Sequence, residues 1–265
     1  MLVATFNCNS INARLDFVLD FLETRRPDVV LLQELKLDDA SFPRDRFEAA
    51  GFRAFTHGQA QWNGVAVLLR SALVSGADVP EIIQSGLPGQ EANGARLVTL
   101  RALGGTFTSV YVPNGKSVGH ADFPMKLAWL DSLAEHLERA IDGASRAVVG
   151  GDFNLVPADL DSHNPEGFRG RIFHTDDERA RWSRIKGDKL FDLFREKEPE
   201  LQSFSWWDYR AGSFHKKQGL RIDFLLGTRS VLERTERVWI DRDFRKKRSD
   251  RIPSDHAPVL AEIAW

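Results

Sequence analysis

The stretch Gly150-Gly151-Asp152-Phe153-Asn154 directly follows the apolar run Ala147-Val148-Val149. Side chains along a strand alternate between its two faces, so Asp152 and Asn154 can point the same way. The two glycines allow another group to approach the backbone closely. The pattern predicts a buried strand that ends in a site for a phosphate or a metal. The alternative is an ordinary polar strand end before a loop.

The composition fits a globular protein, with 265 residues, 42% hydrophobic and 28% charged. No Pro-, Gly- or Ser-rich linker divides the chain, so we predict a single domain over residues 1–265. No apolar run reaches about 18 residues, which predicts no transmembrane helix. Residues 1–6 are apolar without a basic leader and predict a strand rather than a signal peptide. Cys8 is the only cysteine, which excludes an internal disulfide and fits a reducing cytoplasm.

The net charge of −2 gives no general sign of nucleic-acid binding, but the basic residues are unevenly distributed. One stretch, residues 242–251, contains Arg242, Arg245, Lys246, Lys247, Arg248 and Arg251, and a second group is Lys216 and Lys217. Such loops can contact DNA phosphates, and the alternative is a solvated surface loop. The first stretch lies just before Pro253-Ser254-Asp255-His256, and this position favours phosphate contact.

Strand and helix signals alternate along the chain. Apolar steps of three and four residues predict a helix over 13–24 and a second helix with Pro124 in its first turn and its end at Gly143. Residues 158–189 are highly charged with few apolar anchors, which predicts a mobile surface insertion with short helices. Apolar or alternating runs predict strands at 2–7, 29–33, 52–56, 64–69, 95–101, 106–112, 147–152, 203–207, 221–226, 237–240 and 258–263.

Each half of the chain contains a strand, a helix and a further strand that ends in an acid. The acid is Glu34 in the first half and Asp152 in the second. This repetition suggests two similar halves, which we expect to pack as sheets covered by helices in one domain.

Other polar residues also stand at or near predicted strand ends, and each has a simple structural alternative. Glu34 can form a salt bridge, Tyr111 can be a core tyrosine with a satisfied hydroxyl, and Asp223 can pair with Arg221. Asp255-His256 can be a local hydrogen-bonded pair. Asn7 and Asn9 at the end of the first strand extend the set.

Together these groups are too many for one core to pair separately, because an unpaired buried carboxylate is costly. We therefore predict a common cleft. Carboxylate and amide oxygens suit a hard cation such as Mg²⁺. Zinc fits less well, because there is one Cys and no paired His spacing. A His beside an Asp can act as a base or bind a phosphate oxygen.

These residues resemble those of bacterial exonuclease III and the abasic-site (AP) endonucleases of the endonuclease/exonuclease/phosphatase superfamily. The matching stretches occur in order along the whole chain, which makes the combined signal strong although each motif alone is weak. They are FNCNSI (6–11), DVVLLQE (28–34), NGVAV (63–67), YVPNG (111–115), GDFN (151–154), GLRID (219–223) and SDHAP (254–258).

The resemblance implies an α/β fold: a four-layered α/β sandwich in which two facing mixed β-sheets are flanked by helices, as in DNase I. It places the active site at one edge of the two sheets. It also implies a Mg²⁺ cofactor, for which Mn²⁺ is a possible substitute. A bound metal would both neutralise phosphate charge and generate the nucleophile.

The resemblance also implies a role for each matched residue. Glu34 is expected to be the principal Mg²⁺ ligand, and the full metal-binding set is Asn7, Glu34, Asp152, Asn154, Asp255 and His256. Asp152 would activate or orient the attacking water, or protonate the leaving group. Asn154 and Asn7 would hold phosphate oxygens. Tyr111 would contact the phosphate or leaving oxygen, and His256, oriented by Asp223, would stabilise its charge.

The motifs alone do not separate nucleases from phosphatases of the superfamily, but three features favour abasic DNA. Phe204, Trp206, Trp207 and Leu220 are expected to wall a pocket for an extruded sugar without a base, with core packing as the alternative for the tryptophans. Basic groups can hold the DNA backbone, and Asn114-Gly115-Lys116 follows the site strand as in the resembled family. The expected substrate-binding residues are Asn9, Asn114, Lys116, Trp206, Trp207, Lys217 and Leu220.

The expected function is Mg²⁺-dependent cleavage 5′ to abasic sites in duplex DNA, leaving a 3′-hydroxyl, with 3′–5′ exonuclease and 3′-phosphatase or phosphodiesterase activity. Leu220 stands where the animal enzymes carry a bulkier aromatic residue, which leaves the balance of these activities open. We expect a bacterial cytoplasmic, nucleoid-associated monomer that has no contact with membranes. The alternatives are a phosphatase or phosphodiesterase of small phosphorylated ligands, and a non-catalytic DNA-binding relative, which the complete set of polar residues disfavours.

Overall fold

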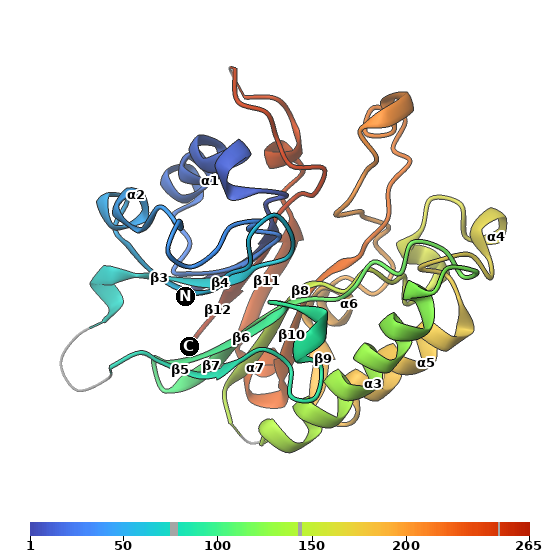
Figure 1. Ribbon diagram of the computed structural model, residues 1–265, viewed down its shortest axis with the longest axis horizontal. Coiled ribbons are helices and arrows are strands. Elements are labelled where there is room, and N and C mark those ends of the chain that lie inside the picture. Colours follow the sequence, from blue (N-terminus) through green and yellow to red (C-terminus); the bar gives the residue numbers. More distant parts are fainter. Residues whose placement is uncertain (75–78, 143–144, 249) are drawn as a thin grey trace.

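Two mixed β-sheets face each other and carry helices on their outer faces (Figure 1). The computed structural model describes residues 1–74, 79–142, 145–248 and 250–265. The first sheet has the order β11 (Thr235–Ile240), β12 (Val259–Ile263), β1 (Leu2–Asn7), β2 (Val29–Gln33), β4 (Val65–Arg70) and β3 (Phe52–His57). The second has the order β5 (Glu81–Ser85), β6 (Leu97–Ala102), β7 (Gly105–Tyr111), β8 (Ala147–Asp152), β10 (Asp223–Thr228) and β9 (Leu190–Asp192).

The helices complete the four layers and confirm the fold class expected from the sequence. The outer face of the first sheet is covered by α1 (Ile11–Arg25) and α2 (Arg44–Ala49), and that of the second by α3 (Asp122–Ala140) and α5 (Asp176–Lys186). The shorter helices are α4 (Pro165–Phe168), α6 (Leu193–Lys197) and α7 (Arg229–Arg234). Within the described ranges, no helix combines the length and the apolar character that a membrane span requires.

Strands buried on both faces explain the continuous apolar runs in the sequence. In β2, Val29 and Leu31 point into the central core between the sheets, whereas Val30 and Leu32 pack with Phe17 of α1. Successive side chains alternate between the two faces of a strand, so a strand covered on both sides needs apolar residues at every position.

The acids predicted to end two strands meet because each sheet contains one parallel pair with a helical crossover. β1 and β2 are parallel and joined by α1, and β7 and β8 are parallel and joined by α3. Parallel strands end at the same sheet edge, and Glu34 directly follows β2 while Asp152 ends β8. The central strands of the two sheets face each other, so both acids lie at one edge of the sandwich.

The predicted short helices at 158–189 are present, but the prediction of a surface insertion with few apolar anchors is wrong. Trp182 and Ile185 of α5 are buried in the layer between the second sheet and α3, where the Trp182 ring lies 4.4 Å from that of Phe224. Thr175 and Glu178 cap the start of α5 with reciprocal hydrogen bonds. Two buried apolar side chains three positions apart fix this helix although its other faces are charged.

The predicted strand at 203–207 is also wrong. Trp206 forms only isolated bridges, with Leu220 and His256, and the Ser205 hydroxyl accepts the backbone N–H groups of Ile222 and Asp223. Sequence patterning misses β5, whose side chains are mostly exposed, and β9, which has three residues. The second predicted helix ends at Ala140, and its expected end at Gly143 lies outside the described residues.

Candidate active site

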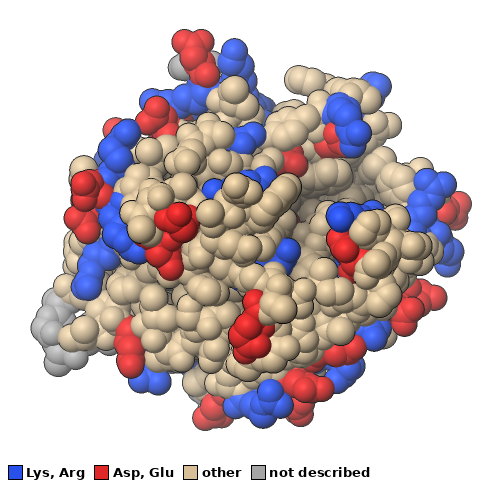
Figure 2. Space-filling model, in the orientation of Figure 1, with Lys and Arg blue, Asp and Glu red and all other residues tan. Residues whose placement is uncertain are grey.

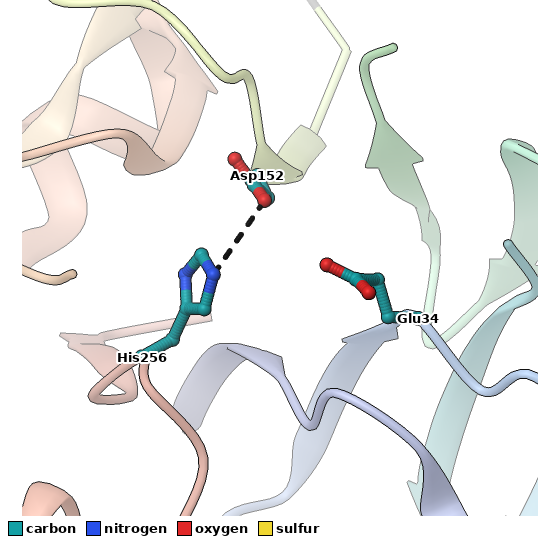
Figure 3. Close-up of side chains that lie close together, drawn as sticks. All are labelled: Glu34, Asp152 and His256. Atoms are coloured by element: carbon teal, nitrogen blue, oxygen red, sulfur yellow. Dashed lines mark ion pairs between the residues drawn. The ribbon is translucent and has the colours of Figure 1, made fainter. Parts of the chain in front are cut away.

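The acids of the two sheets are joined by an amide at the shared sheet edge. The Asn7 Nδ2 atom donates to Glu34 Oε1 and to Asp152 Oδ2, each at 2.9 Å. One potential ligand atom from each of Glu34, Asp152 and His256 lies within 4.8 Å of the others (Figure 3). Residues 34, 152 and 256, far apart in the chain, therefore form one compact cluster, which we call the acid cluster.

Backbone conformation shapes this cluster as well. Asn9, Glu34 and Asn154 all have left-handed backbone, with φ of 48°, 55° and 48°. Non-glycine residues rarely adopt this conformation, and it concentrates at functional sites. The Asn154 N–H donates to Asp152 Oδ1 at 2.9 Å. The carboxylate of Asp152, at the end of β8, therefore stabilises the turn that follows the strand.

A buried carboxylate holds His256 in place. The His256 Nδ1 atom lies 2.9 Å from Asp223 Oδ2, and the Ser205 hydroxyl donates to the same oxygen at 2.6 Å. The other ring nitrogen, Nε2, lies 3.8 Å from Asp152 Oδ2 (Figure 3). Burial alone would lower the pKa of His256, but the carboxylates of Asp223 and Asp152 raise it to about 10. At neutral pH His256 is therefore an imidazolium that can donate from both nitrogens.

The surroundings of Asp152 favour its uncharged form, whereas those of His256 favour its charged form. Burial raises the pKa of Asp152 to about 8, and the charges of Asp223 and Glu34 add to this effect, whereas His256 opposes it. A carboxyl with a pKa near neutral can both accept and donate a proton. A cation placed in the acid cluster would favour the ionised form.

Tyr111 and two asparagines border Asp152. Tyr111 ends β7 in register with Asp152 of β8. Burial, followed by the charges of Glu34 and Asp152, raises the pKa of Tyr111 well above its usual value, so its hydroxyl keeps its proton. The Asn154 Nδ2 atom donates to the Val112 carbonyl at 2.9 Å, and Asn114 Nδ2 donates to Asn154 Oδ1 at 3.3 Å.

Asp255 lies beside the acid cluster and has its own partners. Its two carboxylate oxygens accept from Asn9 Nδ2 at 2.8 Å and from Trp206 Nε1 at 2.9 Å. Burial would raise the pKa of Asp255, but the charge of His256 and these two hydrogen bonds hold it below its usual value. Asp255 thus links Asn9 with Trp206.

Two of the expected ligands fit a divalent cation in this arrangement. Glu34 and Asp152 offer carboxylate oxygens, which divalent cations prefer. The Lys36 ammonium lies 2.9 Å from Glu34 Oε2, so a positive charge already occupies this position. His256 can offer its Nε2 lone pair to a metal only in the neutral form, because an imidazolium has no free lone pair. The amide oxygen of Asn7 accepts the Asn9 N–H at 3.0 Å, and Asn154 and Asp255 have the partners given above.

An aromatic cavity lies next to the acid cluster. Its volume is about 410 Å³, and the same face of the molecule is hollowed beside the segment 209–218 (Figure 2). Trp206 joins the two regions, because it lines the cavity while its indole N–H donates to Asp255. The side chains that line the cavity with Trp206 include Leu220, Phe168, Phe173, His163 and His174.

The predicted pocket wall is partly wrong. Trp206 and Leu220 line the cavity, but Phe204 and Trp207 belong to the central core. Trp207 is fully buried, with its ring 5.0 Å from that of Phe214, so it has no surface for DNA. The aromatic residues that line the cavity in their place come from 158–189, a segment without apolar periodicity in the sequence.

The predicted basic contacts also change. Arg245 is buried and donates to the backbone carbonyls of Asp255 and Trp207. Arg248 and Arg251 both pair with Asp20. Lys246, Arg248 and Arg251 of this stretch therefore have acidic partners, whereas Arg242 lies over the rings of Trp207 and Phe214. Of the other two lysines in the predicted set, Lys116 pairs with Asp122 at 2.9 Å, and Lys217 is exposed.

Sequence reasoning missed several residues that support the acid cluster. Ser205 orders Asp223, Lys36 pairs with Glu34, and the Arg96 guanidinium lies 4.8 Å from the centre of the Tyr111 ring. Lys36 stands two positions after Glu34, which is the one available sequence signal. Ser205 and Arg96 reach the cluster through tertiary folding alone.

Two facing sheets with buried acids, an imidazolium and amides at one edge define a class of phosphate-ester hydrolases. The family model described as the endonuclease/exonuclease/phosphatase family matches residues 4–256. The chain belongs to this family.

Relatives cover the whole chain. Exodeoxyribonuclease III of Haemophilus influenzae is 34% identical over 98% of both chains. Among solved structures, an AP endonuclease from Archaeoglobus fulgidus has a TM-score of 0.93 at 29% identity. The 3′ phosphatase NExo from Neisseria bound to product DNA hairpin has a TM-score of 0.91 at 34% identity. Both structures and this chain match over 100% of their lengths.

Proposed function

We propose that this protein is a metal-dependent DNA repair nuclease. It cleaves duplex DNA 5′ to abasic sites and also removes nucleotides or phosphates at 3′ ends. Mg²⁺ is the preferred cofactor, and Mn²⁺ replaces it. The relatives named above support nuclease chemistry on DNA. The protein works as a single-domain monomer in the bacterial cytoplasm, on DNA of the nucleoid.

Each side chain of the acid cluster has a separate role in phosphodiester hydrolysis. A divalent cation held by Glu34 and Asp152 would neutralise phosphate charge and favour formation of hydroxide. Asp152, which a cation at this position would keep ionised, accepts the proton of the attacking water and can then return it to the leaving oxygen. His256 donates from Nε2 to a phosphate oxygen, while Asp223 keeps Nδ1 occupied.

Neutral donors complete the phosphate site. The Tyr111 hydroxyl keeps its proton and donates to the phosphate or to the leaving oxygen. The Asn154 and Asn7 amides hold further phosphate oxygens. Without substrate, Asn7 Nδ2 donates to Glu34 and Asp152, and Asn154 Nδ2 donates to the Val112 carbonyl and Asp152. Each amide therefore releases one of these hydrogen bonds when it donates to a phosphate oxygen.

The position of the aromatic cavity next to the acid cluster is the observation that favours abasic DNA as the substrate. Trp206 contributes both to the cavity wall and, through Asp255, to the surroundings of the acid cluster. A sugar without a base, turned out of the duplex into this cavity, would place its 5′ phosphate near the cluster. Apolar walls suit such a sugar, because it has no base edge to hydrogen-bond.

A gel assay with three duplexes tests this function. One duplex contains an abasic site, one has a recessed 3′ end and one has a 3′-phosphate, each with Mg²⁺ and with EDTA. We expect Mg²⁺-dependent cleavage of the abasic duplex, and a Trp206→Ala variant should lose this activity more than activity at a recessed end. An abasic duplex left intact with Mg²⁺ would overturn the proposal. Hydrolysis of an inositol phosphate in the same preparation would then support the small-ligand phosphatase.

A further inference from the structure

Lys126 of α3 is a buried cation that lies outside the acid cluster. It contacts the two loops that carry the Asn114 and Asn154 amides. Its side chain is 0% exposed. The Nζ atom donates to Glu178 Oε1 at 2.5 Å, to the Asn154 carbonyl at 2.5 Å and to the Asn114 carbonyl at 3.3 Å. An ammonium has three N–H donors, so these contacts use all of them.

Glu178 of α5 is the partner of Lys126 and is equally buried. Besides Lys126 it accepts from the Phe173 N–H at 3.2 Å, and from the N–H and hydroxyl of Thr175 at 3.2 and 2.8 Å. Phe173 lines the aromatic cavity, and the Lys126 ammonium lies 4.7 Å from the centre of its ring. The ion pair therefore connects the turn after β8 with the cavity wall.

Stability alone does not account for this ion pair. Removing two charges from water is costly, and replacing a buried pair by apolar residues is often neutral or stabilising. Here the hydrogen bonds that the pair makes beyond its own contact go mainly to the backbone of segments 114, 154 and 173–175. Asn154 has a left-handed backbone, and its carbonyl is anchored by Lys126. Without that anchor, the turn would be free to relax.

We propose that Lys126 and Glu178 are positioning residues that fix the amides of Asn154 and Asn114 relative to the cavity wall. Neither side chain touches the substrate. They act through the carbonyls of the two asparagines and through the backbone of residues 173–175. This inference deepens the proposed function, because the Asn154 amide is expected to hold a phosphate oxygen and Asn114 is expected to bind the substrate.

Paired substitutions separate positioning from stability. The double variant Lys126→Met/Glu178→Leu removes both charges together and leaves no orphan ion, and Glu178→Gln is a near-isosteric single change. The control is Arg181→Met, which breaks the ion pair of Arg181 with Asp131 at 2.9 Å between the same two helices. Both side chains of this control pair are partly exposed, at 22% and 28%, so its loss should affect stability less than loss of a fully buried pair.

The first measurement is steady-state kinetics on the phosphate ester that the wild-type protein hydrolyses fastest, together with thermal unfolding. The double variant leaves backbone groups at 114, 154 and 173–175 without these partners, so we expect its melting temperature to fall. At a temperature where it is fully folded, we expect it to lose kcat by about 10- to 100-fold, with KM changed less than about threefold. Glu178→Gln should lose kcat in the same direction, and Arg181→Met should retain it. A double variant or Glu178→Gln with kcat within about threefold of the wild type would overturn the proposal.

A second measurement does not depend on the identity of the substrate. Amide hydrogen exchange should become faster at residues 114–116 and 153–156 in the double variant and in Glu178→Gln, but not in Arg181→Met. Unchanged exchange in these segments would refute the positioning role even if the protein is the nuclease proposed above. Conversely, faster exchange in a protein that leaves every DNA duplex intact would support positioning and contradict the nuclease.

Discussion

Replacing Asp223 with Asn should change the charge of His256 at neutral pH. The substitution removes the carboxylate 2.9 Å from His256 Nδ1 but keeps an oxygen that can accept the hydrogen bond. Burial then remains as the main influence and opposes the charges of Asp152 and Asp255, so the pKa of His256 falls from about 10 toward its ordinary value. A full fall to the ordinary value of about 6.5 would raise the neutral fraction of the ring at pH 7.5 from ~0.3% to ~90%. The phosphate would lose a charged donor.

The size of the effect on stability follows from the same values. A fall in the pKa of His256 from about 10 to 6.5 corresponds to at most about 5 kcal/mol. Loss of one partner of a buried pair typically costs about 3–5 kcal/mol, so the two figures agree.

The direction of the His256 pKa shift predicts how the stability difference between the two proteins changes with pH. The folded pKa of His256 lies above the unfolded one, so the pair contributes fully below about pH 6.5, and its contribution is lost as the pH rises through 10. The substitution removes the Asp223 charge, which raises the pKa of Asp152, and weakens the His256 charge, which lowers it, so the two effects on Asp152 oppose each other. The stability of wild type minus that of Asp223→Asn should therefore be largest at pH 6 and close to zero above pH 10.

Urea unfolding in EDTA at pH 6, 8 and 10, with an NMR titration of the His256 ring, measures both quantities. EDTA removes competition from metal ions at the acid cluster. Equal stability differences at pH 6 and pH 10 would refute the reasoning, as would a wild-type His256 ring that titrates near pH 6.5.

Three further substitutions test other parts of the structure. Asp152→Asn should lower kcat by about 10²- to 10⁴-fold while DNA still binds in a filter assay, and normal turnover would remove Asp152 from proton transfer. Glu34→Gln should raise the Mg²⁺ concentration for half-maximal cleavage by at least ~10-fold, and an unchanged metal titration would show that Glu34 is not a ligand. Trp182→Ala should reduce the free energy of unfolding in urea by about 3–5 kcal/mol. A loss below about 1 kcal/mol would mean that α5 is not anchored in the core.

The central part of the fold could be predicted because its strands are buried on both faces. Continuous apolar runs at 29–33 and 147–149 mark such strands, and an acid at the end of each is costly without a partner. This reasoning predicts a common cleft for Glu34 and Asp152, and the family resemblance places that cleft at one edge of the two sheets. Edge strands such as β5 carry no such signal, because their side chains are mostly exposed.

Residues held by tertiary contacts alone escaped prediction. Trp206 and Trp207 are adjacent in the sequence, yet one lines the cavity and the other is fully buried. Arg245 is part of a basic run but is buried on carbonyls, which charge patterning cannot show. The cavity wall from 168 to 174 depends on α5, whose anchors Trp182 and Ile185 are two apolar residues in a charged helix.

Locating a bound metal tests the central claim most directly, that Glu34 and Asp152 form the cation site of a phosphodiesterase. Crystals of the protein soaked in Mn²⁺ would give an anomalous difference map. We predict one strong peak within bonding distance of a Glu34 carboxylate oxygen and beside Asp152, with Lys36 displaced from Glu34. A peak elsewhere, or none at the acid cluster in crystals of active protein, would contradict the account.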